Sequence, residues 1–289
     1  MKYSIFTVMA PGCTVEQIGE KLQAHGYDGV EWRVGRRVEE EPQPLPARAQ
    51  WYWEYNRATL NLEDIEKEAA WAAAVCERNE LEKVSLASYL MPAQLADIER
   101  LLEAAKHNGF QMIRLFPDKY TGAEPYPRMM ERVRRELREV ERMARRCGVR
   151  VTLEIHMDTI IPSASAACRL LEGMDEELLG VVYDAGNMVY EGYEQYQMGL
   201  EMLGARVHHV HLKDARVLPC AGGGYAASFC RIGEGQVRFD KLFDALKKQG
   251  YAGYLSFEDF SAPHEEDEKL ARNLAYIKTI WEESGFRPL

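Results

Sequence analysis

Four residues that could bind a metal ion each stand at the end of a short apolar run. They are Glu154 in VTLEIH, Asp184 in VVYDAGN, His211 in VHHVHLKD and Glu258 in LSFED. Three carboxylates gathered together repel one another unless a cation lies between them. Three oxygen donors and one imidazole suit Mn²⁺ or Mg²⁺, with Co²⁺, Zn²⁺ or Fe²⁺ as alternatives, since no thiolate favours softer metals. The pattern predicts one divalent-metal site, with Mn²⁺ as the expected ion. The alternative is that each acid caps a loop or pairs with Lys or Arg.

The elements that must bring these residues together repeat in a regular order. A short β-branched or aromatic run is followed by an amphipathic helical stretch and a turn, which predicts parallel strands with crossover helices. Eight strands are expected, as a closed barrel requires. Their predicted ranges are 3–9, 29–33, 83–87, 112–116, 150–155, 180–184, 207–212 and 254–258. We therefore predict an α/β fold, a single (β/α)8 TIM barrel that spans residues 1–289 as one domain.

Two unusually long connections would lie at the face where the strands end. They run from Val34 to Asn61 and from Lys213 to Arg238, and each follows a predicted strand. In barrels of this kind the active site lies at that face, and long loops there are often lids or binding loops. An aromatic cluster at residues 51–55 of the first connection could stack on a sugar, or pack in a subunit interface.

Three further polar residues lie near the predicted site. His156, two positions beyond the first of the four, could donate a hydrogen bond to a substrate hydroxyl or simply to the backbone. Lys213 could hold an oxyanion or phosphate, or form a salt bridge with Asp214 or Glu258. His209 alternates with the metal-ligating histidine, so it should face inward below the metal and orient a ligand.

The chain resembles a known group of proteins, the xylose isomerase-like sugar phosphate isomerase/epimerase superfamily. That superfamily includes ketose 3-epimerases, inosose dehydratases and endonuclease IV. The resemblance covers nearly the whole chain. Its motifs are GYDGVE at 26–31, LEIH at 153–156, YDAGN at 183–187, VHLKD at 210–214, IGEG at 232–235 and SFE at 256–258.

The resemblance implies a mechanism for the predicted site. In the epimerases of this superfamily the glutamates that match Glu154 and Glu258 bind the metal and flank the substrate. One removes a proton beside a carbonyl group, and the other returns it. A metal that holds the carbonyl and a neighbouring hydroxyl acts as a Lewis acid. We therefore expect a divalent-metal-dependent isomerase or epimerase, with both glutamates catalytic, that acts on a small sugar, keto-sugar or cyclitol.

The sequence also departs from the ketose 3-epimerases. Asn187 stands where those enzymes have a histidine, and Ile160 where they have an additional glutamate. Arg216 lies near the place of their substrate-binding arginine. We expect Asn187, Arg216 and Glu31, which lies near the end of the second strand, to contact substrate. The alternative function is inosose-type dehydration, which begins with the same proton abstraction.

Two other functional classes are disfavoured. Endonuclease IV needs further histidines where this chain has Glu31-Trp32-Arg33, Ala87-Ser88-Tyr89 and Asn187. The formal net charge of −10 and the pI near 5.4 also disfavour nucleic acid and anionic membranes as partners. A non-catalytic sugar-binding barrel is a third interpretation, against which the complete ligand set argues.

The composition also bears on the compartment and the partners. No apolar stretch approaches the roughly 20 residues that span a bilayer. The N-terminus lacks the features of a secretory signal. Six cysteines without CxxC pairs favour a reducing cytoplasm. The expected partner is a small-molecule carbohydrate, with no nucleic acid and no membrane, and the chain could form a homodimer or homotetramer.

Overall fold

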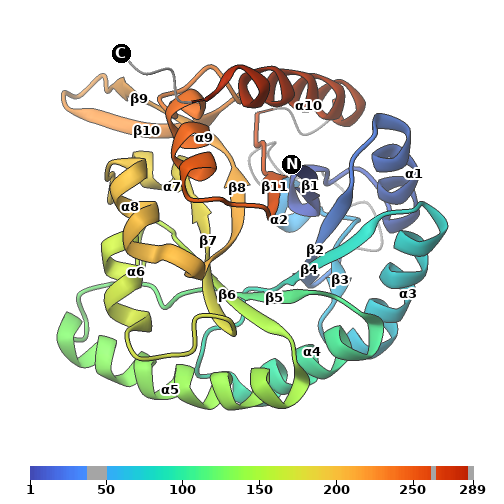
Figure 1. The fold of residues 1–289 in the computed structure, drawn as a ribbon, viewed down its shortest axis with the longest axis horizontal. Helices are drawn as coiled ribbons and strands as arrows, with labels where there is room; N and C mark the ends of the chain where they lie inside the picture. The colour runs from blue at the N-terminus through green and yellow to red at the C-terminus, as the bar shows by residue number, and fades with distance from the viewer. Residues whose placement is uncertain (38–50, 262–264, 286–289) are drawn as a thin grey trace.

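The computed structural model describes residues 1–37, 51–261 and 265–285, in which eight parallel strands close into a barrel (Figure 1). The strands follow the order β1-β11-β8-β7-β6-β5-β4-β2, and β1 pairs with both β11 and β2. The predicted TIM barrel is therefore confirmed. The strands are β1 (Lys2–Phe6), β2 (Gly29–Gly35), β4 (Glu82–Ala87), β5 (Met112–Leu115), β6 (Arg150–Glu154), β7 (Leu179–Asp184), β8 (Val207–Leu212) and β11 (Tyr254–Phe257). A short strand, β3 (Leu60–Asn61), extends the sheet beside β2.

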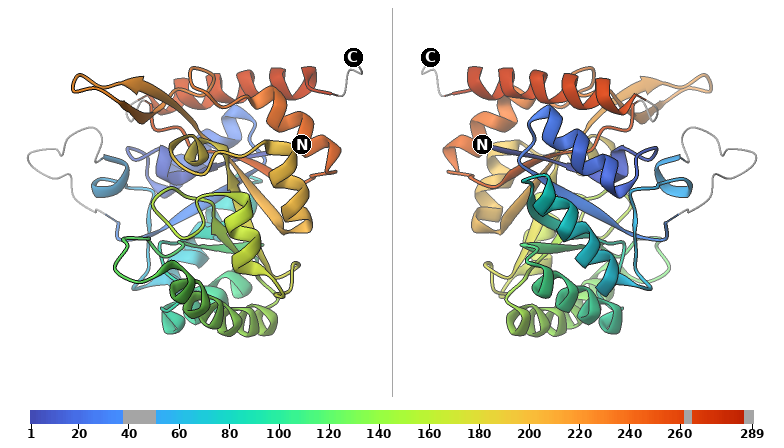
Figure 2. Two further views of the ribbon diagram at one scale, coloured as in Figure 1. Left: turned by 90° about the vertical axis from the view of Figure 1, so that its left-hand side faces the viewer. Right: turned by 90° about the vertical axis from the view of Figure 1, so that its right-hand side faces the viewer.

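Helices surround the barrel, as Figures 1 and 2 show. They are α1 (Val15–His25), α3 (Ile65–Arg78), α4 (Leu95–Asn108), α5 (Tyr126–Cys147), α6 (Ala164–Leu171), α8 (Tyr196–Leu203), α9 (Phe239–Lys248) and α10 (Glu266–Glu283). The two ends of α1 illustrate how the local sequence sets the limits of a helix. The Thr14 side chain accepts a hydrogen bond from the Gln17 backbone, and the Gln17 side chain accepts one from Thr14 in return. Gly26 ends the helix in the left-handed conformation, at φ 76°.

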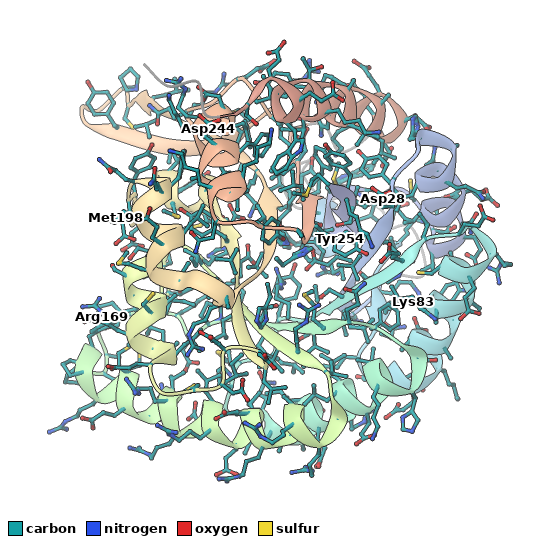
Figure 3. All side chains as sticks on the ribbon, in the orientation of Figure 1. Asp28, Lys83, Arg169, Met198, Asp244 and Tyr254 are labelled. Carbon is teal, nitrogen blue, oxygen red and sulfur yellow. The ribbon has the colours of Figure 1, made fainter. Side chains whose placement is uncertain are left out.

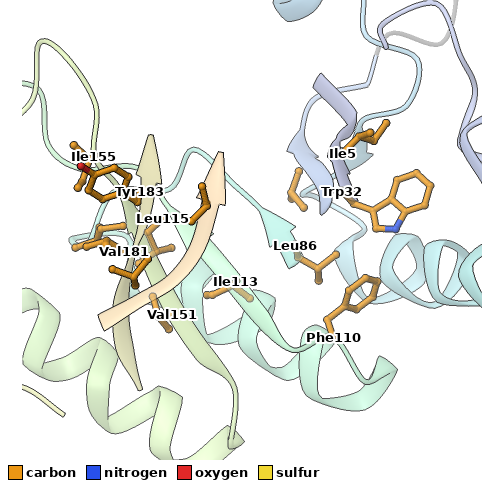
Figure 4. Close-up of a cluster of buried hydrophobic side chains, with 14 of the residues drawn as sticks. Ile5, Trp32, Leu86, Phe110, Ile113, Leu115, Val151, Ile155, Val181 and Tyr183 are labelled. Atoms are coloured by element: carbon orange, nitrogen blue, oxygen red, sulfur yellow. The ribbon is translucent and has the colours of Figure 1, made fainter. Parts of the chain in front are cut away.

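The hydrophobic core lies between the strands and the helices. Figure 4 shows part of it, with Leu86 near Phe110 and with Val151 near Val181. Polar side chains instead gather on the outer faces of the helices. In Figure 3, Arg169 lies at the outer edge, whereas Tyr254 lies close to the barrel axis.

The long connections contain structure that the sequence did not predict. The second one forms an antiparallel hairpin of β9 (Asp214–Pro219) and β10 (Tyr225–Cys230), which projects from the barrel in Figure 1. The first contains α2 (Trp51–Glu54), and its residues 38–50 lie outside the described residues. The predicted first strand is too long, because Thr7–Met9 form a 3₁₀ turn. A short helix, α7 (Ala185–Tyr190), follows β7 directly.

Two properties of the described residues bear on the compartment predictions. None of their helices is long and apolar enough to cross a membrane. All six cysteines are free thiols, and Cys220 is the exposed one.

Candidate metal centre

The four predicted metal ligands meet in one buried cluster at the carboxyl ends of neighbouring strands. Glu154, Asp184, His211 and Glu258 can each offer one ligand atom, and these atoms all lie within 4.8 Å of one another. The His211 Nδ1 atom lies 3.2 Å from Glu258 Oε2, 3.6 Å from Glu154 Oε1 and 3.8 Å from Asp184 Oδ2. At most 3% of each side chain is exposed. The sequence-based expectation that these residues converge is therefore met.

One unpartnered atom and the donor set fit a divalent cation. His211 Nδ1 is buried and has no hydrogen-bond partner, whereas Asp184 Oδ2 and Glu258 Oε2, which are also buried, pair with the Lys213 ammonium. Leaving such groups unsatisfied is costly unless something binds them. Carboxylate oxygens and an imidazole are a donor set for Mn²⁺, Mg²⁺ or Zn²⁺. All four residues could hold the ion.

Two neighbours fix the Glu154 carboxylate. Arg114 donates a hydrogen bond to Oε2, and Asn187 Nδ2 donates one to Oε1 at 2.9 Å. Burial alone would raise the pKa of Glu154, but the Arg114 and Lys213 cations hold that pKa well below its usual range. No role had been predicted for Arg114. The feature that could have indicated a role is the position of Arg114 inside a buried strand, because that strand pairs with the strand that carries Glu154.

Asn187 lies within the cluster and anchors it. Its backbone N–H donates to Asp184 Oδ1 at 2.8 Å, and Asp184 thereby caps the start of α7. Its side-chain oxygen accepts from Lys213 Nζ at 3.0 Å. Asn187 therefore bonds to two of the candidate metal ligands, Glu154 and Asp184, and to Lys213, and its predicted contact with substrate stays a prediction.

Glu31 lies behind His211 in the interior of β2, and its predicted contact with substrate stays a prediction. The Oε2 atom of Glu31 lies 2.9 Å from His211 Nε2 and 3.1 Å from His209 Nε2. It also accepts from Ser256 Oγ at 3.2 Å, and none of the Glu31 side chain is exposed. The reason is that β2 continues to Gly35, so Glu31 is an interior position of the strand. His209 and His211 thus share one carboxylate oxygen, and the orienting role expected of His209 stays a prediction.

Lys213 lies among the carboxylates. Its Nζ forms ion pairs with Glu258, with Asp184 at 2.9 Å and with Glu154 at 3.6 Å. Burial disfavours its charge, but these carboxylates raise its pKa above the usual range. The aromatic rings of Phe229 and Phe260 cover the ammonium, with ring centroids 5.2 and 5.4 Å away. The sequence suggested a salt bridge from Lys213 to Asp214 or to Glu258, and the structure contains the one to Glu258.

The two remaining predicted residues differ in position. His156 lines a cavity of about 790 Å³ beside the cluster, and its Nδ1 donates to the Met157 carbonyl at 2.7 Å. The nitrogen left for a ligand is Nε2. Arg216 does not join the cluster: it is exposed on β9, opposite Ser228. Its predicted contact with substrate stays a prediction.

Comparison with known proteins gives four findings. Residues 20–280 match the family model described as xylose isomerase-like TIM barrel. An inosose dehydratase of Clostridium perfringens strain 13 is 25% identical over 279 residues, which cover 91% of this chain and 86% of that protein. The 3-keto-D-glucoside 4-epimerase of E. coli superposes with a TM-score of 0.71 at 18% identity, covering 96% of this chain and 99% of that one. The IolI protein with a bound zinc atom superposes with a TM-score of 0.72 at 15% identity, covering 98% and 99%. The last two likenesses show a shared fold.

Proposed function

The chain belongs to the xylose isomerase-like TIM barrel family, and from this we propose that it is a divalent-metal-dependent sugar isomerase or epimerase. Its substrate would be a small sugar, keto-sugar or cyclitol. One observation carries the proposal. Glu154 and Glu258 stand at the two ends of an arc of four neighbouring strands, with Asp184 and His211 between them. A substrate held at the centre would have one glutamate on each side.

The two glutamates would move the proton. A divalent ion held by the four residues would withdraw electrons from a carbonyl oxygen and so acidify the neighbouring C–H bond. One glutamate then takes the proton from that carbon, and the other delivers a proton to the opposite face or to the adjacent carbon. Arg114 and Lys213 keep the Glu154 carboxyl ionised, as a base must be. Asn187 fixes its orientation.

We propose Mn²⁺ as the ion, with Zn²⁺ as the first alternative. Three oxygen donors and one nitrogen favour the harder ion. The zinc atom bound by the structurally similar IolI protein supports the alternative.

Dehydration of an inosose-like cyclitol is the second candidate. The observation in its favour is the similarity to an inosose dehydratase along 91% of this chain. Dehydration starts with the same proton removal but then expels a hydroxyl group, which leaves as water after it receives a proton. The Lys213 ammonium, 2.9 Å from Asp184 Oδ2, lies where it could donate that proton.

Proton exchange in D₂O tests both candidates. We would follow ketoses, inososes and ring-oxidised sugars by NMR with the chelated protein and after adding Mn²⁺, Mg²⁺, Co²⁺ or Zn²⁺. Deuterium incorporation with formation of an epimer or isomer supports the first candidate, and loss of water with formation of an unsaturated ketone or its enol supports the second.

Substitution of a proton-transfer residue is the matching prediction. Glu154→Gln keeps a metal-binding oxygen but removes the base, so turnover should fall by at least a thousandfold while metal affinity falls only in part. Glu141→Gln on α5, far from the cluster, is the control. Full activity in Glu154→Gln, or metal-independent exchange in the native protein, would contradict the proposal.

A further inference from the structure

A second feature of the barrel mouth is the cavity of about 790 Å³ beside the metal cluster. Its walls come from α2 and from the segments that follow β4, β5 and β6. Sites that enclose drug-sized ligands measure roughly 300–1,000 Å³, so this cavity has room for more than one small ring. The residues that matter here are Trp53, Tyr89, Met91, Phe116, Tyr120 and His156.

The walls expose large apolar side chains. Trp53 is 43% exposed, Met91 41% and Tyr120 44%, and all three face this one cavity. Apolar surface gathered in a hollow is typical of a ligand site, because a ligand that covers it removes that surface from water. Flat rings such as those of Trp53 and Tyr120 suit a ligand with a flat apolar face.

The cavity also offers a buried hydrogen-bond acceptor. Asp118 is 7% exposed, and its Oδ1 accepts from Arg132 at 3.1 Å. Its Oδ2 is buried and has no hydrogen-bond partner. A buried carboxylate oxygen without a partner is costly, so a donor from a ligand would satisfy it.

The cavity adjoins Glu154 rather than Glu258. The Tyr89 ring lies 4.9 Å from the Arg114 guanidinium, which in turn pairs with Glu154. The His156 ring packs against Phe116 with centroids 4.9 Å apart. None of the four metal-ligating residues lines the cavity. A substrate chelated at the cluster would reach the cavity only with a part that projects past Glu154.

We propose that the substrate is larger than one ring. Resting on the function proposed above, the inference is that a keto-sugar or cyclitol ring binds at the metal and is joined to a second ring in the cavity. That ring stacks on Trp53 and Tyr120 and donates a hydroxyl hydrogen to Asp118. An aromatic group and a second sugar share this chemistry.

Three ring-oxidised glucosides that differ only in the attached group test the inference. The group is methyl, p-nitrophenyl or a second glucose, and kcat and KM are measured for the Mn²⁺-loaded protein. Trp53→Ala and Tyr120→Ala should each raise KM about three- to tenfold for the p-nitrophenyl substrate, the glucosyl substrate or both. The kcat values should not change, and neither should the KM of the methyl substrate, which has no second ring. The substrate affected identifies the second ring as aromatic or sugar. Tyr225→Ala, which removes a side chain 76% exposed on the hairpin, is the matched control.

A binding experiment separates this inference from the proposed function. Equilibrium binding of p-nitrophenyl and methyl glucosides, followed by tryptophan fluorescence, needs no turnover. Tighter binding of the p-nitrophenyl compound that weakens in Trp53→Ala and Tyr120→Ala supports the cavity assignment even if no proton exchange is found. Equal KM for all three groups, together with equal binding of the p-nitrophenyl and methyl compounds that is unchanged in both variants, would overturn the assignment and leave metal-dependent turnover standing.

Discussion

At the scale of single residues, the two nitrogens of His211 have different tasks. Nδ1 faces the three carboxylates, whereas Nε2 lies 2.9 Å from Glu31 Oε2. A carboxylate behind the imidazole fixes its tautomer and makes the nitrogen that faces the metal more basic. Glu31→Gln should therefore lower Mn²⁺ affinity about 10- to 100-fold and leave the fold intact. Calorimetric titration with Mn²⁺ and circular dichroism measure the two effects.

The control for that prediction is a half-buried carboxylate outside the cluster. Glu141 accepts hydrogen bonds from the Asp175 backbone and from Arg145, so Glu141→Gln reports any general cost of losing such a group. If both variants bind Mn²⁺ as the native protein does, Glu31 does not position His211.

A second prediction at this scale concerns His208 and the pH dependence of the stability of the protein. It is 7% exposed, its Nε2 donates to the Glu176 carbonyl at 2.7 Å, and its Nδ1 is buried without a partner. Burial lowers its pKa to about 4. The unfolded chain therefore binds more protons than the native protein between about pH 4 and 6.5. Stability attributable to neutral His208 is present above pH 6.5 and falls by about 3 kcal/mol as the pH drops to 4.

Urea unfolding across pH 4–7 measures this loss. His208→Gln keeps a donor for the Glu176 carbonyl but cannot be protonated, so its stability should fall less steeply. His107→Gln, at an exposed histidine, should behave as the native protein does. An unchanged slope in His208→Gln would show that other groups cause the acid loss.

The same residues show what sequence could predict about the site. The four metal ligands stand at or just past the ends of apolar runs, so their position follows once a barrel is assumed. Glu31 and Arg216 could not be placed this way. Their positions depend on how far β2 continues and on whether the loop after β8 folds into a hairpin. Both are decided by pairing with distant segments.

At the scale of elements, Asp214 joins the hairpin to the turn that follows it. Its Oδ1 accepts from Ala215 and Val237, and its Oδ2 accepts from Gly233 and Gly235, at 2.9–3.1 Å. Asp214→Asn replaces one acceptor oxygen by a donor, which leaves two backbone N–H groups unsatisfied. At about 1–3 kcal/mol each, we expect a loss of about 2–6 kcal/mol. Chemical unfolding measures it, with Asp240→Asn at an exposed site as control.

The packing of this turn explains its glycine motif. A Cβ at Gly235 would lie 2.1 Å from Asp214 Oδ1. A side chain there would displace the carboxylate from its four donors. If Asp214→Asn unfolds as the native protein does, the carboxylate does not hold the turn, and the glycine is needed because a Cβ there would lie 2.4 Å from the Ala215 carbonyl oxygen.

Elements differ in how far sequence predicts them. The barrel strands are apolar runs bounded by turn residues, so they were found within a few residues of their ends. The short helix α7 has only six residues, and it depends on the Asp184 cap and on Gly186, whose missing Cβ lets the Lys213 backbone approach. The hairpin strands are mostly exposed and carry little periodicity. Tertiary contacts determine whether α7 and the hairpin form, and the local sequence pattern does not predict those contacts.

At the scale of the whole molecule, the barrel closes where its first and last strands meet. β1 pairs with β11, and α10 lies between α9 and α1 in the ring of helices (Figure 1). Lys269 of α10 is fully buried, and its Nζ donates to the carbonyls of Met9 and Asp259, just past the ends of β1 and β11. One side chain thus ties both sides of the closure to the last helix.

Burial lowers the pKa of Lys269 to about 8. Below pH 8 its ammonium is charged in both states, so the native protein bears the full desolvation penalty. Between about pH 8 and 10.5 the native amine is neutral while the unfolded chain still holds the proton, so stability rises with pH. Relative to Lys269→Met, the native protein should gain up to about 3 kcal/mol across this range.

Urea unfolding of both proteins at pH 7.5, 9 and 10 measures the difference, with Lys241→Met as an exposed control. A difference that stays constant with pH would mean that Lys269 holds its proton throughout, and that the two carbonyls at the closure compensate for its burial.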